Sequence, residues 1–102
     1  MEYVIEATEE FDEWLAGLSD QDARGRINAR ILRAEMGNLG ATKSVGDKVA
    51  EMILDFGPGY RLYYWKRGRT IFLLLCGGDK STQKKDIKRA MVIQQKVEAN
   101  PK

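Results

Sequence analysis

Residues 56–80, FGPGYRLYYWKRGRTIFLLLCGGDK, limit the possible folds more than any other part of the chain. Residues 57–59 are Gly-Pro-Gly, in which proline fixes φ and the following glycine can adopt a positive φ. This combination predicts a type II turn that opens onto a strand. Residues 60–66 supply that strand, because they are rich in aromatic residues and end at a charged turn.

The second half of the same stretch predicts a partner strand. Gly68, among basic residues, marks a short reversal, and residues 71–76 form a continuous apolar run short enough to be a buried strand. Gly77 and Gly78 are expected to end it. We therefore expect a central β-hairpin, with Arg61 at one exit.

The remaining elements predict one α+β domain over residues 1–102. Residues 2–7 alternate as a short strand, and Thr8 and Ser19 are N-cap candidates for two helices that form an antiparallel hairpin ending near Gly37. Residues 41–48 are expected to be a loop. Residues 49–56 are expected to form a strand with its even-numbered side chains inward, and a last helix is expected from Ser81 to about Ala99. The predicted fold is therefore an antiparallel sheet of about four strands packed by helices.

Composition restricts the class of protein. The chain has 102 residues, 43% of them hydrophobic and 31% charged, and it contains no apolar run of about 18 residues that would cross a membrane. The start lacks the pattern of a signal peptide, so a cytoplasmic protein is expected. Cys76 is the one cysteine, and its apolar neighbours favour a buried hydrophobic side chain over a reactive thiol.

Charge is distributed unevenly along the chain. Residues 1–59 contain 6 basic and 12 acidic side chains, a net charge of −6, whereas residues 60–102 contain 11 and 3, a net charge of +8; together they make the +2 of the whole chain. This asymmetry favours a surface for a polyanion, such as nucleic acid or an acidic protein segment, in the C-terminal half. The alternative is that helix faces pair their charges across the fold. For the second helix we prefer this alternative: its arginines are expected to lie in solvent and pair with the acidic first helix, and not to contact RNA.

The strand of residues 60–66 carries a possible nucleic-acid surface. Its alternation places Arg61, Tyr63 and Trp65 on one open face of the sheet, where an arginine flanked by aromatic rings suits a phosphate and a base. Simple packing of the rings, with Arg61 paired to Asp55, explains the same pattern equally well.

The residue types available limit any catalysis. The chain contains no histidine and a single cysteine, which argues against the usual metal sites, and no phosphate-loop spacing is present. An enzyme built from it would use Arg, Lys, Asp, Glu and Tyr, without a cofactor. These suffice for RNA cleavage, because RNA supplies its own nucleophile, the 2′-OH, and the protein adds proton transfer, charge stabilisation and alignment.

Nearly the whole chain resembles the RelE/ParE/HigB superfamily of toxins from type II toxin–antitoxin modules, in the HigB-like branch called addiction module killer protein. The segments that carry the resemblance are RAEMGNLGATKSVGDKVAEMILDFGPGYRLYY and LLLCGGDKSTQKKDIKRA. It implies a RelE-like, microbial-ribonuclease-like fold and a ribosome-dependent mRNA endoribonuclease, or mRNA interferase, that inhibits translation. It also implies a cognate antitoxin of helix-turn-helix type as partner, besides the ribosome and mRNA.

The resemblance also implies site residues. Arg61 corresponds to the arginine at the scissile phosphate, and Lys80 lies near a second catalytic cation. Asp86 falls close to a catalytic polar position, with Lys85 as an alternative for proton transfer. Gln83 and Lys84 are the implied RNA contacts, and the strand pattern adds Tyr63 or Trp65 for stacking a base.

Two departures from the superfamily pattern keep other functions open. The strand before the central turn lacks the basic residues of RelE-like members, and the histidines of HigB-like members are missing. A gyrase poison like the ParE members is the first alternative. The second is a non-catalytic module that binds the antitoxin or nucleic acid.

Overall fold

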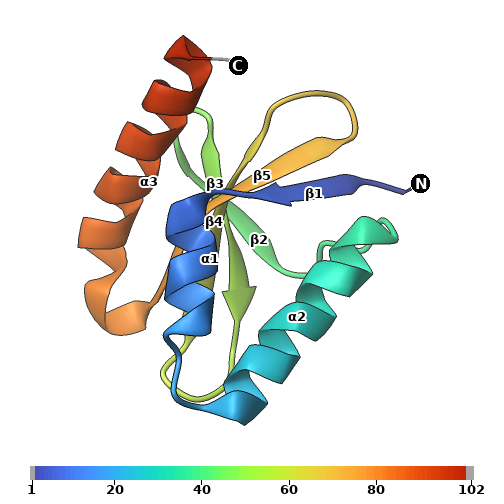
Figure 1. Cartoon of the computed structure of the whole chain (residues 1–102), viewed down its shortest axis with the longest axis vertical. Helices are drawn as coiled ribbons and strands as arrows, with labels where there is room; N and C mark the ends of the chain where they lie inside the picture. Colours follow the sequence, from blue (N-terminus) through green and yellow to red (C-terminus); the bar gives the residue numbers. More distant parts are fainter. Residues whose placement is uncertain (1, 101–102) are drawn as a thin grey trace.

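A five-stranded mixed sheet forms the centre of the computed structural model, which describes residues 2–100. The strands lie in the order β1-β5-β4-β3-β2, and every neighbouring pair is antiparallel except β1 and β5, which are parallel. The predicted α+β class is therefore confirmed, with five strands in place of about four. Three helices cover the sheet, α1 and α2 on one face and α3 on the other (Figure 1).

The first elements follow the predicted order. β1 (Val4–Ala7) leads into α1 (Glu9–Ala16), and the hydroxyl of Thr8 accepts a hydrogen bond from the Phe11 amide at 3.1 Å, as expected for an N-cap. Helix α2 (Gln21–Glu35) is capped by Asp20 and not by Ser19, since the Asp20 carboxylate accepts from the Ala23 amide. From their short connection the two helices run in opposite directions and diverge (Figure 1).

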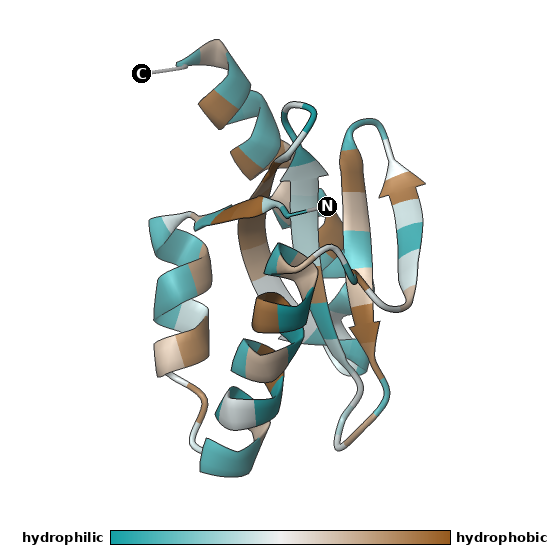
Figure 2. Ribbon diagram, turned by 90° about the vertical axis from the view of Figure 1, so that its right-hand side faces the viewer, coloured by the Kyte–Doolittle hydropathy of each residue, from teal (hydrophilic) through white to brown (hydrophobic). Residues whose placement is uncertain are grey.

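Strand β2 (Thr42–Gly46) lies where a loop was expected. It pairs with β3 (Val49–Leu54) through a tight turn in which Gly46 and Asp47 have φ of 121° and 50°. Hydrophilic and neutral residues dominate this outermost strand (Figure 2). An edge strand needs only one pairing partner and little apolar surface, so its sequence lacks the hydrophobic alternation from which a strand is predicted.

The predicted central hairpin is confirmed as β4 (Tyr60–Lys66) and β5 (Ile71–Asp79). The prediction that Gly77 and Gly78 end the second strand is wrong, because both residues lie within β5. Their function is close packing: a Cβ on Gly77 would stand 2.3 Å from the Trp14 ring, and one on Gly78 would stand 1.9 Å from the Asp86 carboxylate.

Both faces of the sheet are covered. Phe11, Ile27 and Leu62 belong to the core beneath α1 and α2, whereas Tyr63, Leu75 and Ala90 belong to the core beneath α3. The predicted open face around Arg61 is therefore wrong. Strand β3 likewise buries side chains of both parities, and not only the even-numbered set.

The last helix begins later than expected. Residues Lys80–Thr82 form a 3-10 turn whose cap is Asp79, which accepts hydrogen bonds from the Ser81 amide and hydroxyl, and α3 (Gln83–Ala99) follows. Ser81 is thus part of the turn and not an N-cap. No helix in residues 2–100 is long and apolar enough to span a membrane.

Candidate functional site

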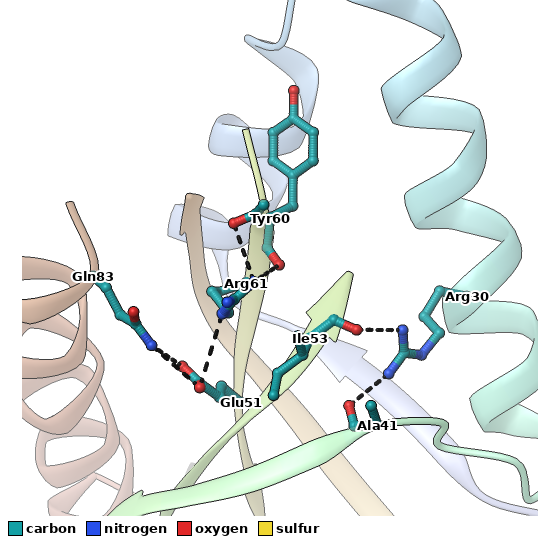
Figure 3. Close-up of polar contacts among 8 residues, drawn as sticks. Arg30, Ala41, Glu51, Ile53, Tyr60, Arg61 and Gln83 are labelled. Carbon is teal, nitrogen blue, oxygen red and sulfur yellow. Dashed lines mark hydrogen bonds and ion pairs between the residues drawn. The ribbon is translucent and has the colours of Figure 1, made fainter. Parts of the chain in front are cut away.

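Arg61 lies on the α3 side of the sheet, near the start of β4, where it pairs with Ile53 of β3 and Gly78 of β5. Its side chain is almost completely buried. Nη1 donates to the backbone oxygens of Gly59 at 3.2 Å and Tyr60 at 3.0 Å, so the guanidinium folds back toward the turn that precedes its own strand (Figure 3).

Glu51 is the acidic neighbour of this arginine. It is 2% exposed, and both of its carboxylate oxygens accept hydrogen bonds from Gln83 Nε2, at 3.0 and 3.2 Å (Figure 3). Arg61 Nε lies 3.9 Å from Glu51 Oε2, at the limit of an ion pair. Arg61 therefore pairs with Glu51 and not with the predicted Asp55. Gln83 also joins the first turn of α3 to the sheet.

Arg61, Glu51 and Gln83, with the neighbouring Tyr63, form a polar cluster on the α3 side of the sheet. Two buried polar atoms of this cluster have no hydrogen-bond partner within residues 2–100: Arg61 Nε and the Tyr63 hydroxyl. Burial, followed by the nearby Glu51 and Asp86 carboxylates, raises the Tyr63 pKa, so the hydroxyl keeps its proton. Unpartnered buried donors are costly and are uncommon in folded proteins.

The predicted base-stacking role of Tyr63 is wrong in this conformation, because its side chain is 0% exposed. A base cannot reach a ring that is sealed beneath a helix. Trp65 is half-buried, and the Arg67 guanidinium lies 5.6 Å from its ring centroid. A stacking role for Trp65 stays a prediction.

Asp86 lies in the first turn of α3 and is also buried. Its Oδ2 accepts a 2.5 Å hydrogen bond from the Thr82 hydroxyl, directly above Gly78. The structure therefore places Asp86 in the same polar cluster as Arg61. Lys84 and Lys85 are exposed on the outer side of the turn.

Lys80 and Arg61 meet at Gly59. A Cβ on this glycine would stand 3.5 Å from the Lys80 Cβ and 3.7 Å from Arg61 Nη1, and Gly59 itself has a φ of 81°. Both cations line a hollow of about 380 Å³ formed largely by residues 55–59. On its other side Lys80 borders a hollow of about 480 Å³ that Gln83, Lys84 and Lys85 also line.

These contacts define what the site can do. Lys80 and Arg61 supply positive charge for a phosphate, and Asp86 and Glu51 are carboxylates within the same cluster. Within residues 2–100, no group of three His, Cys, Asp or Glu side chains is placed to hold a metal ion. The cations of this cluster can bind an anion, and its carboxylates are groups that can accept a proton.

Glu51 and Thr82 were missed as members of the cluster. Alternation assigned Glu51 to the solvent side of β3, but that side is covered by α3. The signal available in the sequence was the position of Glu51 between apolar residues on a strand.

Two further expectations concern residues outside the cluster. Cys76 is confirmed as a buried side chain, and burial raises the pKa of its thiol to about 12. The expectation that the arginines of the second helix lie in solvent is wrong for Arg30. Its Nε, Nη1 and Nη2 donate to the backbone oxygens of Leu39, Ile53 and Ala41.

The fold and the cluster together define a small α+β protein with a cationic site at the end of its central hairpin. A Haemophilus influenzae protein described as an uncharacterized protein is 47% identical to the chain over 93 residues, which cover 91% of this chain and 94% of the relative. The chain belongs to the family of that protein. No family model and no solved structure matches it.

Proposed function

We propose that this protein is the toxin of a type II toxin–antitoxin module, a ribosome-dependent mRNA endoribonuclease that inhibits translation in the cytoplasm and is neutralised by a cognate antitoxin. The observation that carries the proposal is the convergence of Arg61 and Lys80 on one hollow at Gly59. These two cations are 19 positions apart in sequence, and they are the pair to which the superfamily resemblance assigns the scissile phosphate.

The proposed roles follow from exposure and position. Lys80 is exposed and contacts the phosphate first, and Arg61 lines the same hollow from beneath the turn. Asp86, or the exposed Lys85, carries the proton from the 2′-OH to the leaving 5′-oxygen, while the 2′-oxygen forms a bond to phosphorus and the bond from phosphorus to the 5′-oxygen breaks. Gln83 holds Glu51 beside the guanidinium, and Lys84 extends the positive surface at the start of α3.

The burial of Arg61 favours a second candidate, a gyrase poison of the ParE type. With little exposed surface, and Nη1 bonded to carbonyls of its own turn, Arg61 is poorly placed to leave its position during catalysis. In that case Lys80, Lys84 and Lys85 would form a binding surface without ribonuclease chemistry.

Inducible expression without antitoxin, followed by primer extension on an abundant translated mRNA and a gyrase supercoiling assay, separates the candidates. We expect growth arrest and cleavage at codon boundaries that disappears when translation is blocked. Lys80→Ala, at an exposed position that cannot disturb the core, should reduce cleavage at least about tenfold, whereas Lys96→Ala, at the far end of α3, should not. Intact mRNA with inhibited supercoiling would reject the nuclease in favour of the gyrase poison.

A further inference from the structure

A third hollow lies on the opposite side of the Asp55–Phe56 corner, between α2 and the end of β3. Its volume is about 250 Å³. Arg26, Ala29, Arg30 and Arg33 of α2 occupy positions i, i+3, i+4 and i+7, so all four share one helix face. The small Ala29 side chain leaves the space between the arginines open. The hollow is completed by Leu54, Asp55 and Phe56.

The three arginines of this hollow have different freedom. Arg30 is committed to backbone oxygens. Arg33 is exposed, and its side chain has no hydrogen-bond or ion-pair partner among residues 2–100. Arg26 is 57% exposed, pairs with Asp22 at 3.2 Å, and holds its guanidinium 4.9 Å from the centroid of the Phe56 ring. Arg33 and the Arg26–Phe56 pair are therefore available to a ligand.

The lining of the hollow carries an excess of positive charge, even when the Arg26–Asp22 ion pair is counted. Asp55 is the single acidic residue in its lining, against three arginines. The charge of Arg33, after burial, lowers the pKa of Arg30, which indicates that these cations repel one another. An anion would relieve this repulsion.

The hollow adjoins the candidate site. Asp55 and Phe56 line both this hollow and the one that contains Arg61 and Lys80, so the two share a wall. A nucleic-acid strand that passes around this corner can place neighbouring phosphates at the two hollows. A stacked guanidinium and ring beside an apolar floor suits a nucleobase, whereas an acidic peptide would use the cations alone.

We infer that the hollow formed by Arg26, Ala29, Arg33 and Phe56 binds one nucleotide of single-stranded RNA, next to the phosphate held at Arg61 and Lys80. Arg33 contacts the phosphate of that nucleotide, and the Arg26–Phe56 pair faces the base. The inference rests on the proposed function for the identity of the RNA, and it assigns the contact to α2, which the nuclease site does not include.

The test is equilibrium binding of a short 2′-O-methyl RNA, labelled with a fluorophore and measured by anisotropy, since the blocked 2′-OH prevents cleavage. Arg33→Ala, Arg26→Ala and Ala29→Glu should each weaken binding at least about fivefold. Arg33→Ala should also lower the slope of log K against log salt by about 0.7. Lys96→Ala removes the same charge far from α2 and should leave binding unchanged. Circular dichroism verifies the fold of each variant.

The outcomes separate this inference from the proposed function. If the three α2 variants bind RNA as tightly as Lys96→Ala does, the hollow is not a nucleotide subsite, even where the protein cleaves mRNA. Failure of the wild-type protein to bind RNA, with binding of poly-L-glutamate in its place, would also overturn the inference and assign the hollow to an acidic protein segment. RNA binding that depends on Arg33 without mRNA cleavage would support the subsite and reject the nuclease.

Discussion

Two buried arginines lie on opposite sides of the central sheet, and their environments differ. Arg30 is 8% exposed and Arg61 is 7% exposed. Every nitrogen of the Arg30 guanidinium region donates to a backbone oxygen, and these oxygens belong to segments 9 to 23 residues away. Within the described residues, Arg61 donates hydrogen bonds only to Gly59 and Tyr60, and its Nε lies 3.9 Å from Glu51 Oε2 without a hydrogen-bond partner (Figure 3).

The difference shows that burial does not by itself identify a functional arginine. A guanidinium in which each nitrogen donates to a distant backbone oxygen joins segments together and has little capacity left for a ligand. A guanidinium that makes fewer hydrogen bonds and lines a hollow retains more of that capacity, and its buried unpartnered Nε has a cost in stability. Arg30 is accordingly a structural residue, and Arg61 is the candidate for anion binding.

The largest expected effect is at Arg30. Arg30→Met keeps most of the side-chain volume but leaves the carbonyls of Leu39, Ala41 and Ile53 without their donor. We expect a loss of about 3–4 kcal/mol in the free energy of unfolding, measured by urea denaturation. Arg33→Met on the same helix should change it by less than about 0.5 kcal/mol. Equal effects at the two positions would contradict the structural role.

Arg61→Met should destabilise the protein less, by about 1–2 kcal/mol, because the wild-type guanidinium is only partly satisfied and most of the cost comes from leaving the buried Glu51 carboxylate without its cation. Combining it with Glu51→Gln should recover part of that loss in the same denaturation experiment. Growth arrest on induction should be abolished in both variants. A folded Arg61→Met protein that still arrests growth would contradict the assigned difference between the two arginines, since both would then be structural.

Alkaline pH should affect the core beneath α3. Burial raises the pKa of Cys76 from 9.0 to about 12 and also raises that of Tyr63. Above pH 9 the unfolded chain loses the Cys76 proton while the folded chain keeps it, so this contribution to stability is complete below pH 9 and falls as pH rises toward 12. We expect a loss of about 1 kcal/mol near pH 10, with a shallower decline for Cys76→Ala. If the difference in the free energy of unfolding between wild type and Cys76→Ala did not change with pH, folding would not protect the thiol from ionisation.

The smallest expected effect is at Tyr63. Tyr63→Phe removes a buried hydroxyl that lacks a partner, so we expect stability to rise by up to about 1 kcal/mol, measured as an increase in Tm. Tyr64→Phe serves as the control, since Tyr64 belongs to the core on the other face. Destabilisation by Tyr63→Phe would indicate that the hydroxyl does have a partner, and would weaken the argument that this cluster is incompletely satisfied.

Local patterns predicted most of the fold because local physics controls those elements. Thr8 caps α1, Gly37 follows the end of α2 with a φ of 100°, and the Gly-Pro-Gly turn opens the central hairpin. Strand β2 could not be predicted in the same way, because its pairing with β3 compensates for a polar sequence. The extension of β5 through two glycines depends on Trp14 and Asp86, which pack against them from distant segments.

Sequence alone determined the α+β class, the order of most elements, the burial of Cys76, and Arg61 and Lys80 as candidate residues. Turn chemistry, side-chain period and the resemblance to a known superfamily are all properties that can be read along the chain. The tertiary structure decided which faces are covered and which donors are satisfied. It placed α3 over Tyr63 and Glu51, joined Arg30 to three distant carbonyls, and left Arg61 Nε without a hydrogen-bond partner among residues 2–100, because hydrogen-bond satisfaction depends on segments that meet only after folding.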